Sequence, residues 1–116
     1  RRLLRRGEQS LENGKLSDAK KALMEAAAMK PKAHKPRVLL GYLELNRGNL
    51  GQALKAFRAA NRLKPRDRQT LLGLGSVYAK QGKKADARKI YERYQSYFKG
   101  ASDQRTIENR LEKLGK

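Results

Sequence analysis

Glycine, alanine and bulky apolar residues return every 34 positions along this chain. Self-similarity at a fixed period is typical of repeat architectures, in which each unit buries its apolar face only against its neighbours. The repeat constrains the fold strongly because it holds in several columns without a gap. Those columns are Gly7, Gly41 and Gly75; Gly14, Gly48 and Gly82; Ala19, Ala53 and Ala87; and Leu23, Phe57 and Tyr91.

The second unit indicates how each repeat folds. Pro36 suits the first turn of a helix, which we expect to run to about Asn46. The stretch "NRGN" (46–49) predicts a turn, since Asn and Gly tolerate the left-handed conformation that ends a helix. A second helix is expected from about 50 to 63, and Pro65 ends the unit. Each repeat is therefore a pair of helices joined at a glycine.

The small columns predict close helix packing. Gly41 on the first helix and Ala53 on the second let the two helices approach, and Phe57 fills the remaining space. The same interpretation applies one unit further on. Gly73 also lies inside a predicted helix, where glycine costs about 1 kcal/mol relative to alanine. We interpret Gly73 as a packing position, with room for a ligand's backbone as the alternative.

Across residues 1–101 this pattern resembles the tetratricopeptide repeat family. The resemblance implies an all-α fold, a right-handed α-solenoid of helix-turn-helix units. Three units are predicted, at 1–33, 34–67 and 68–101. The sequence departs from the family in two columns: Leu3, Arg37 and Leu71 stand where tryptophan is common, and Ser10, Glu44 and Tyr78 fill the tyrosine column.

Residues 102–116 resemble the capping helix that closes such arrays. Ser102 is the predicted N-cap, and Ile107, Leu111 and Leu114 recur at helical spacing. An aromatic set precedes this segment, and we expect it to pack in the core beside the last helix, with base stacking as the alternative. Its members are Tyr91, Tyr94, Tyr97 and Phe98.

The residue types that carry catalysis are scarce. The chain has one histidine, His34, and no cysteine. We interpret His34 as a solvated residue of the loop between units. "GLGS" (73–76) lacks the Lys-Ser/Thr of a phosphate loop and falls inside a predicted helix. No cluster of His, Cys or carboxylates has metal-ligand spacing. We therefore expect no enzyme, no cofactor and no metal.

The chain is strongly basic, with 29 Lys plus Arg, 11 Asp plus Glu and a net charge of +18. The excess is spread over all three units, and such a surface attracts polyanions, acidic partners or an anionic membrane face. No stretch approaches the roughly 20 apolar residues of a membrane span, and no signal peptide is evident. We expect a cytoplasmic protein. Because the chain begins at Arg1, we also expect it to be part of a longer polypeptide.

The family resemblance also implies a binding site. In the family, the first helices of the units line a concave groove that holds a peptide or helix of a partner protein. The matching positions here have an apolar centre and a partly basic rim, which suits a short amphipathic helix or an extended segment with hydrophobic anchors. Packing between neighbouring helices is the alternative for some of them. The predicted groove residues are Leu4, Lys35, Val38, Tyr42, Leu45, Asn46, Gln69, Leu72, Ser76, Lys80 and Arg110.

One known function of the family is excluded by particular residues. Members that bind the acidic C-termini of heat-shock chaperones clamp the terminal carboxylate with Lys, Asn and Arg side chains. None of those residue types stands at the matching positions here, so we do not expect such a co-chaperone. The residues present instead are Leu4, Glu8, Leu39, Gln69 and Gly73.

The second helices of the units carry basic columns, which the resemblance places on the convex side. A solvated face is one interpretation; an acidic protein, anionic lipid or a nucleic-acid backbone is another. Aromatic residues make up only 6% of the chain, which leaves few platforms for base stacking. We therefore predict a protein–protein interaction scaffold or adaptor, with nucleic-acid or other polyanion binding as the alternative. The polyanion-binding candidates are Lys20, Lys21, Lys55, Arg58, Arg88 and Lys89.

Overall fold

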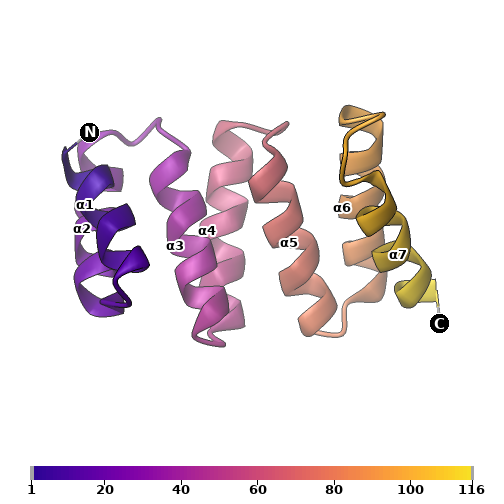
Figure 1. The fold of residues 1–116 in the computed structure, drawn as a ribbon, viewed down its shortest axis with the longest axis horizontal. Coiled ribbons are helices and arrows are strands. Elements are labelled where there is room, and N and C mark those ends of the chain that lie inside the picture. Colours follow the sequence, from indigo (N-terminus) through magenta and orange to yellow (C-terminus); the bar gives the residue numbers. More distant parts are fainter. Residues whose placement is uncertain (1, 116) are drawn as a thin grey trace.

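A computed structural model describes residues 2–115; Arg1 and Lys116, which begin and end the predicted segments, lie outside the described residues. Throughout this range every element is a helix or a connection between helices, which confirms the all-α solenoid. In Figure 1 the odd-numbered helices form one layer, with the even-numbered helices behind it. The helices are α1 (Arg2–Glu12), α2 (Leu16–Met29), α3 (Lys35–Asn46), α4 (Leu50–Leu63), α5 (Arg68–Lys80), α6 (Lys84–Tyr97) and α7 (Gln104–Gly115).

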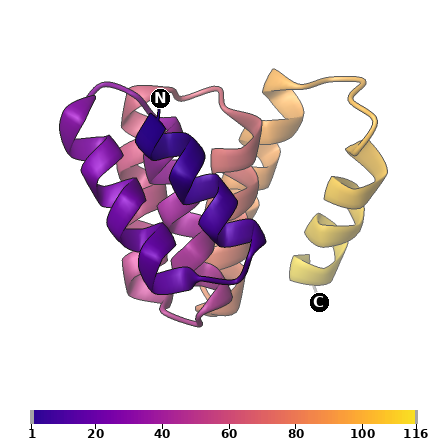
Figure 2. The ribbon, with the colours of Figure 1, turned by 60° about the vertical axis from the view of Figure 1, so that its left-hand side comes forward.

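Glycines in the left-handed conformation end the first helix of each pair. Gly14, Gly48 and Gly82 have φ angles of 74°, 80° and 78°. The amide of Gly48 donates to the carbonyl of Leu45, which tightens the end of α3. The turn predicted from "NRGN" is therefore confirmed. The three pairs α1–α2, α3–α4 and α5–α6 stand in a row (Figure 1), and Figure 2 views this row with the α1–α2 end brought forward and α7 at the right.

Three glycines inside the helices, Gly41, Gly73 and Gly75, are packing positions, as predicted. A Cβ atom built on Gly41 would lie 2.5 Å from the ring of Phe57, and one on Gly75 would lie 2.4 Å from the ring of Tyr91. Gly73 meets the same Phe57 ring from α5, at 2.4 Å. Each aromatic ring therefore lies flush against a helix backbone, at a separation that a methyl group would prevent. Room for a ligand at Gly73 is excluded by this ring.

The C-terminal helix α7 closes the row, and the predicted N-cap at Ser102 is wrong. The helix begins at Gln104, and the carbonyl of Asp103 accepts the amide of Ile107 at 3.1 Å. The carboxylate of Asp103 accepts a hydrogen bond from the hydroxyl of Tyr94 on α6. This contact holds Asp103 at the start of the helix, so Ser102 stays in the preceding turn. Ile107 is fully buried and anchors α7.

Two carboxylates join neighbouring elements. Asp103 receives the Tyr94 hydroxyl and an ion pair from Arg68 Nη2 at 3.3 Å, and these contacts hold its carboxyl pKa below its usual range. Glu44 on α3 is 4% exposed. Its burial opposes the charged form, but hydrogen bonds from Lys20 at 3.0 Å and Asn49 at 3.3 Å outweigh that effect and lower the pKa.

Stability should therefore fall in mild acid. Both carboxyl groups have lower pKa values in the folded chain than in the unfolded chain, so their stabilisation is present above about pH 4.5 and is lost as the pH falls through the folded pKa values. We expect the melting temperature to drop between about pH 5 and pH 3, and Asp103→Asn to flatten that drop. The matched control is Asp18→Asn on α2, an exposed carboxyl that should keep the parent slope. Circular dichroism melts check both; an equal slope in all three proteins would contradict the assignment.

Candidate functional site

The predicted groove residues lie on the first helices of the pairs and on α7, and we call this side of the molecule the groove face. Six of these side chains are half-buried, and four are exposed and polar. The half-buried residues are Leu4, Tyr42, Leu45, Leu72, Ser76 and Arg110, and the exposed ones are Lys35, Asn46, Gln69 and Lys80.

Val38 does not belong to this surface. It is 2% exposed and packs in the same core cluster as Phe57 and Leu71. Val38 stands one helical turn before Tyr42, on the same side of α3. Its short side chain ends beneath its neighbours, whereas the longer tyrosine reaches the surface. The prediction of Val38 as a groove residue is therefore corrected: Val38 is a residue of the core.

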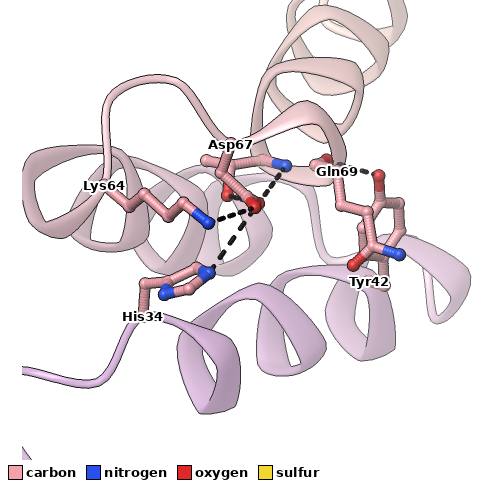
Figure 3. Close-up of polar contacts among 6 residues, drawn as sticks. His34, Tyr42, Lys64, Asp67 and Gln69 are labelled. Atoms are coloured by element: carbon pink, nitrogen blue, oxygen red, sulfur yellow. Dashed lines mark hydrogen bonds and ion pairs between the residues drawn. The ribbon is translucent and has the colours of Figure 1, made fainter.

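Tyr42 is held firmly at the centre of the groove face. Its ring stands edge-on to the Phe57 ring, with the centroids 4.9 Å apart. Its hydroxyl donates to the backbone carbonyl of Gln69 at 2.6 Å, across to α5 (Figure 3). Burial raises the pKa of Tyr42 to about 12, and the nearby Arg110 charge offsets part of that rise. The arrangement gives a partner a rigid aromatic surface, which costs little conformational entropy on binding.

Asp67 fixes the turn that presents Gln69. Its carboxylate caps α5 by accepting the amide of Thr70 at 3.0 Å, and Lys64 Nζ lies 3.9 Å away (Figure 3). Nε2 of His34, at the start of α3, lies 3.5 Å from the same carboxylate. His34 is thus half-buried against the next unit rather than the solvated loop residue expected. The spacing of Asp67 and Thr70 is an N-cap signal that could have revealed this capping site from the sequence.

The basic rim is only partly free. Lys35 pairs with Glu8 of α1 at 3.2 Å, and both side chains are solvent-accessible. Arg110 of α7 donates to the hydroxyl of Tyr91 at 3.3 Å and lies over that ring, 5.7 Å from its centroid. Lys80, in the last turn of α5, has no ion pair among the described residues. In the rim, Lys35 and Arg110 are therefore held by neighbouring side chains, whereas Lys80 has no ion-pair partner among the described residues.

On the opposite side, the basic columns separate into two groups. Lys21, Lys55 and Lys89 are exposed on α2, α4 and α6. The column one residue earlier turns toward the next unit instead, since successive helical residues differ by 100° in direction. Lys20 is bound to Glu44, and Arg88 lies near Gly115 at the end of α7. Of the six polyanion-binding candidates, Lys20 and Arg88 therefore lie apart from the exposed row; Arg58 is exposed like the three lysines.

Metal-ligand geometry is not found in the described part of the chain: residues 2–115 contain no group of three or more His, Asp or Glu placed to hold an ion. Over the same range, each helix is too short or too polar to cross a bilayer. What the described surface offers is a row of half-buried apolar side chains with cations beside it, which is suited to noncovalent recognition.

Sequence and structure comparisons identify the family. The tetratricopeptide repeat family matches residues 4–65 and again 38–104, which together span most of the chain. The chain belongs to the tetratricopeptide repeat family. A sequence comparison with curated proteins finds no match.

Solved structures of the family share this fold at low sequence identity. The Yersinia enterocolitica type III secretion chaperone SycD, in complex with a peptide of the translocator YopD, has a TM-score of 0.92 at 14% identity, covering 98% of this chain and 90% of that one. The TPR2B domain of yeast Sti1, in a pHsp70 complex, has a TM-score of 0.90 at 13% identity, covering 98% and 94%. The Arabidopsis OM64 TPR domain has a TM-score of 0.86 at 12% identity, covering 97% and 90%.

Proposed function

We propose that this chain is a protein-interaction module that holds a segment of a partner protein on its groove face. The observation that carries the proposal is the half-buried apolar row of Tyr42, Leu45 and Leu72, bordered by Lys80 and Arg110. Apolar side chains surrounded by polar ones are the usual anatomy of a binding surface. Peptide complexes of similar domains support the proposal, since SycD and the Sti1 domain are both solved with a bound partner.

The residues of the groove face indicate the chemistry of the partner. A clamp for a terminal carboxylate is absent at the positions where the family builds it. Leu39 is half-buried against the cluster formed by Ala19 and Leu23 of α2 and Leu43 of α3, and the Phe57 ring covers Gly73. The surface fits a segment whose apolar side chains contact Tyr42 and Leu72, with acidic residues facing Lys80.

A photo-reactive amino acid at Gln69 should capture this partner. Gln69 is exposed and its backbone touches Tyr42, whereas Glu25 is exposed on α2 and serves as the control position. We expect a cross-linked partner from Gln69 that survives nuclease and high salt, and no product of the same mass from Glu25. Leu45→Ser should reduce the yield at least about tenfold, the effect of losing one apolar contact of about 1.4 kcal/mol.

Circular dichroism checks that each variant is folded, because Leu45 also packs against the core cluster. A partner captured equally from Glu25, or captured undiminished by a folded Leu45→Ser protein, would overturn the groove assignment. Capture that disappears with nuclease would show that nucleic acid bridges the two molecules.

A further inference from the structure

Two hollows lie on the side of α2, α4 and α6 opposite the groove face, which we call the even-helix face. The first has a volume of about 460 Å³ between α2 and α4, over Leu40 of α3. The second has a volume of about 330 Å³ between α4 and α6, over Leu74 of α5. Each residue lining the second stands 34 positions after a residue lining the first. The two hollows are thus the same structural feature in successive repeats, and α4 forms a wall of both.

Their side chains are chemically opposite. The first, which we call the apolar hollow, is lined by Met24, Ala27, Ala28, Ala56 and Ala59, and Met24 is 55% exposed. The second, the basic hollow, has Arg58, Arg62 and Arg93 at the positions of Met24, Ala28 and Ala59. Two columns are common to both, the leucines Leu40 and Leu74 and the lysines Lys55 and Lys89.

The cations of the basic hollow lie in pairs on its two helical walls and outnumber its acidic groups. Arg58 and Arg62 are one helical turn apart on α4, and Lys89 and Arg93 are one turn apart on α6. Among residues 2–115 none of these four side chains takes part in an ion pair or a side-chain hydrogen bond. Asp86 is the one acidic residue in the lining. Four close positive charges repel one another, and an anionic partner would relieve that repulsion.

The charged groups of the apolar hollow are mostly engaged already. Lys20 and Glu44 bind each other at 3.0 Å, and Arg37 donates to the carbonyl of Pro31 at 2.9 Å. This leaves Lys55 as the cation of this lining with neither an ion pair nor a side-chain hydrogen bond among the described residues, beside the exposed Met24. Flexible, polarisable Met side chains suit contacts with a partner's apolar groups.

We propose that the even-helix face is a second docking site, which takes an acidic protein segment bearing an apolar anchor. The anchor enters the apolar hollow, and carboxylates one repeat further along lie among Arg58, Arg62 and Arg93. Guanidinium groups suit carboxylates because their planar donors bind both oxygens. The neighbouring apolar hollow favours a protein over nucleic acid, since a phosphate backbone has no group that gains from an apolar site.

The repeat itself provides the test variants, because each hollow can be given the residues of the other. Arg58→Met, Arg62→Ala and Arg93→Ala together make the basic hollow resemble the apolar one. Met24→Arg, Ala28→Arg and Ala59→Arg together make the reverse change. Each replacement already occurs at the equivalent backbone position one unit away, so both triple variants should fold.

The probe is a fluorescein-labelled peptide with two leucines, a short Gly-Ser spacer and four glutamates, with a second peptide in which serines replace the leucines. Anisotropy titrations should show that the Arg58→Met, Arg62→Ala, Arg93→Ala protein binds the leucine peptide at least about tenfold more weakly than the parent. The parent should prefer the leucine peptide to the serine peptide, and the Met24→Arg, Ala28→Arg, Ala59→Arg protein should lose that preference.

A control removes the same number of charges elsewhere. Lys32→Ala, Arg105→Ala and Lys113→Ala change exposed residues that line neither hollow, and this protein should bind as the parent does. Equal weakening in the control, or no binding of the leucine peptide by the parent, overturns the proposal.

A labelled single-stranded oligonucleotide is titrated in parallel. If it binds more tightly than the peptide and loses binding on the same arginine changes, the hollow is a nucleic-acid site and the proposal is wrong. The groove variant Leu45→Ser should leave all these titrations unchanged, so the two proposals fail separately.

Discussion

Phe57→Ala should lower the free energy of unfolding by about 3–5 kcal/mol, the usual cost of deleting a buried phenyl ring. Phe57 is fully buried, and its ring touches the backbones at Gly41 of α3 and Gly73 of α5. It also carries the edge-on contact with Tyr42. One side chain therefore joins the second unit to the third. Urea unfolding followed by circular dichroism measures the loss, which is a large share of the roughly 5–15 kcal/mol that stabilises a typical domain.

A glycine pair separates the effect of the ring from that of its surroundings. Gly41→Ala should destabilise the parent by about 1–3 kcal/mol, because the new methyl group would overlap the Phe57 ring. Gly51→Ala, on the exposed face of α4 with nothing within 4 Å, should stabilise by up to about 1 kcal/mol. In the Phe57→Ala background the penalty of Gly41→Ala should disappear. Penalties that are the same in both backgrounds would mean that the ring does not set the spacing of α3 and α4.

The period of the sequence was enough to predict the fold because it specifies contacts as well as helices. Gly41 and Phe57 are 16 positions apart, as are Gly75 and Tyr91, and the structure pairs each glycine with its ring. Regular columns of this kind arise when every unit packs on the next in the same way. Gly48 was predictable for a different reason, since a turn that needs a positive φ restricts the residue choice strongly.

The details that were missed depend on competition between side chains, which periodicity does not describe. Val38 and Tyr42 share a side of α3, and only the length of the side chain decides which one reaches the surface. Ser102 and Asp103 could both cap α7, and the contact of Asp103 with Tyr94 decided between them. Such choices require the three-dimensional neighbours of each residue.

The charge pattern gave a similar partial result. The basic columns were all placed on the convex side, but the structure turns Lys20 into an interunit contact with Glu44. It also shows that Arg58 and Lys89 line one hollow together with Arg93, which was not among the polyanion-binding candidates. Residues on different helices can be assigned to one site only when the arrangement of those helices is known. For that reason the contrast between the two hollows was visible only in the structure.

Ile107→Ala should release the capping helix, at a cost of about 2–5 kcal/mol. Ile107 is the buried residue of α7, and the other apolar residues of that helix, Leu111 and Leu114, are only half-buried. A terminal helix contacts only its neighbour, so its loss need not unfold the remaining units. We expect trypsin to cleave after Arg105 much faster than in the parent, while most helical circular dichroism is retained. Leu114→Ala is the matched control and should change the cleavage rate far less.

Release of α7 should also change the electrostatic environment of Tyr42 on the groove face. Arg110 departs with the helix, and its charge is what partly offsets the raised pKa of Tyr42. The pKa of Tyr42 should therefore rise further when Ile107→Ala detaches the cap, and a tyrosine absorbance titration against Tyr42→Phe measures the change. Unchanged titration together with fast cleavage would show that Arg110 acts on Tyr42 from a position that α7 does not control. A rise in both measurements would show that the position of α7 controls the charge around Tyr42.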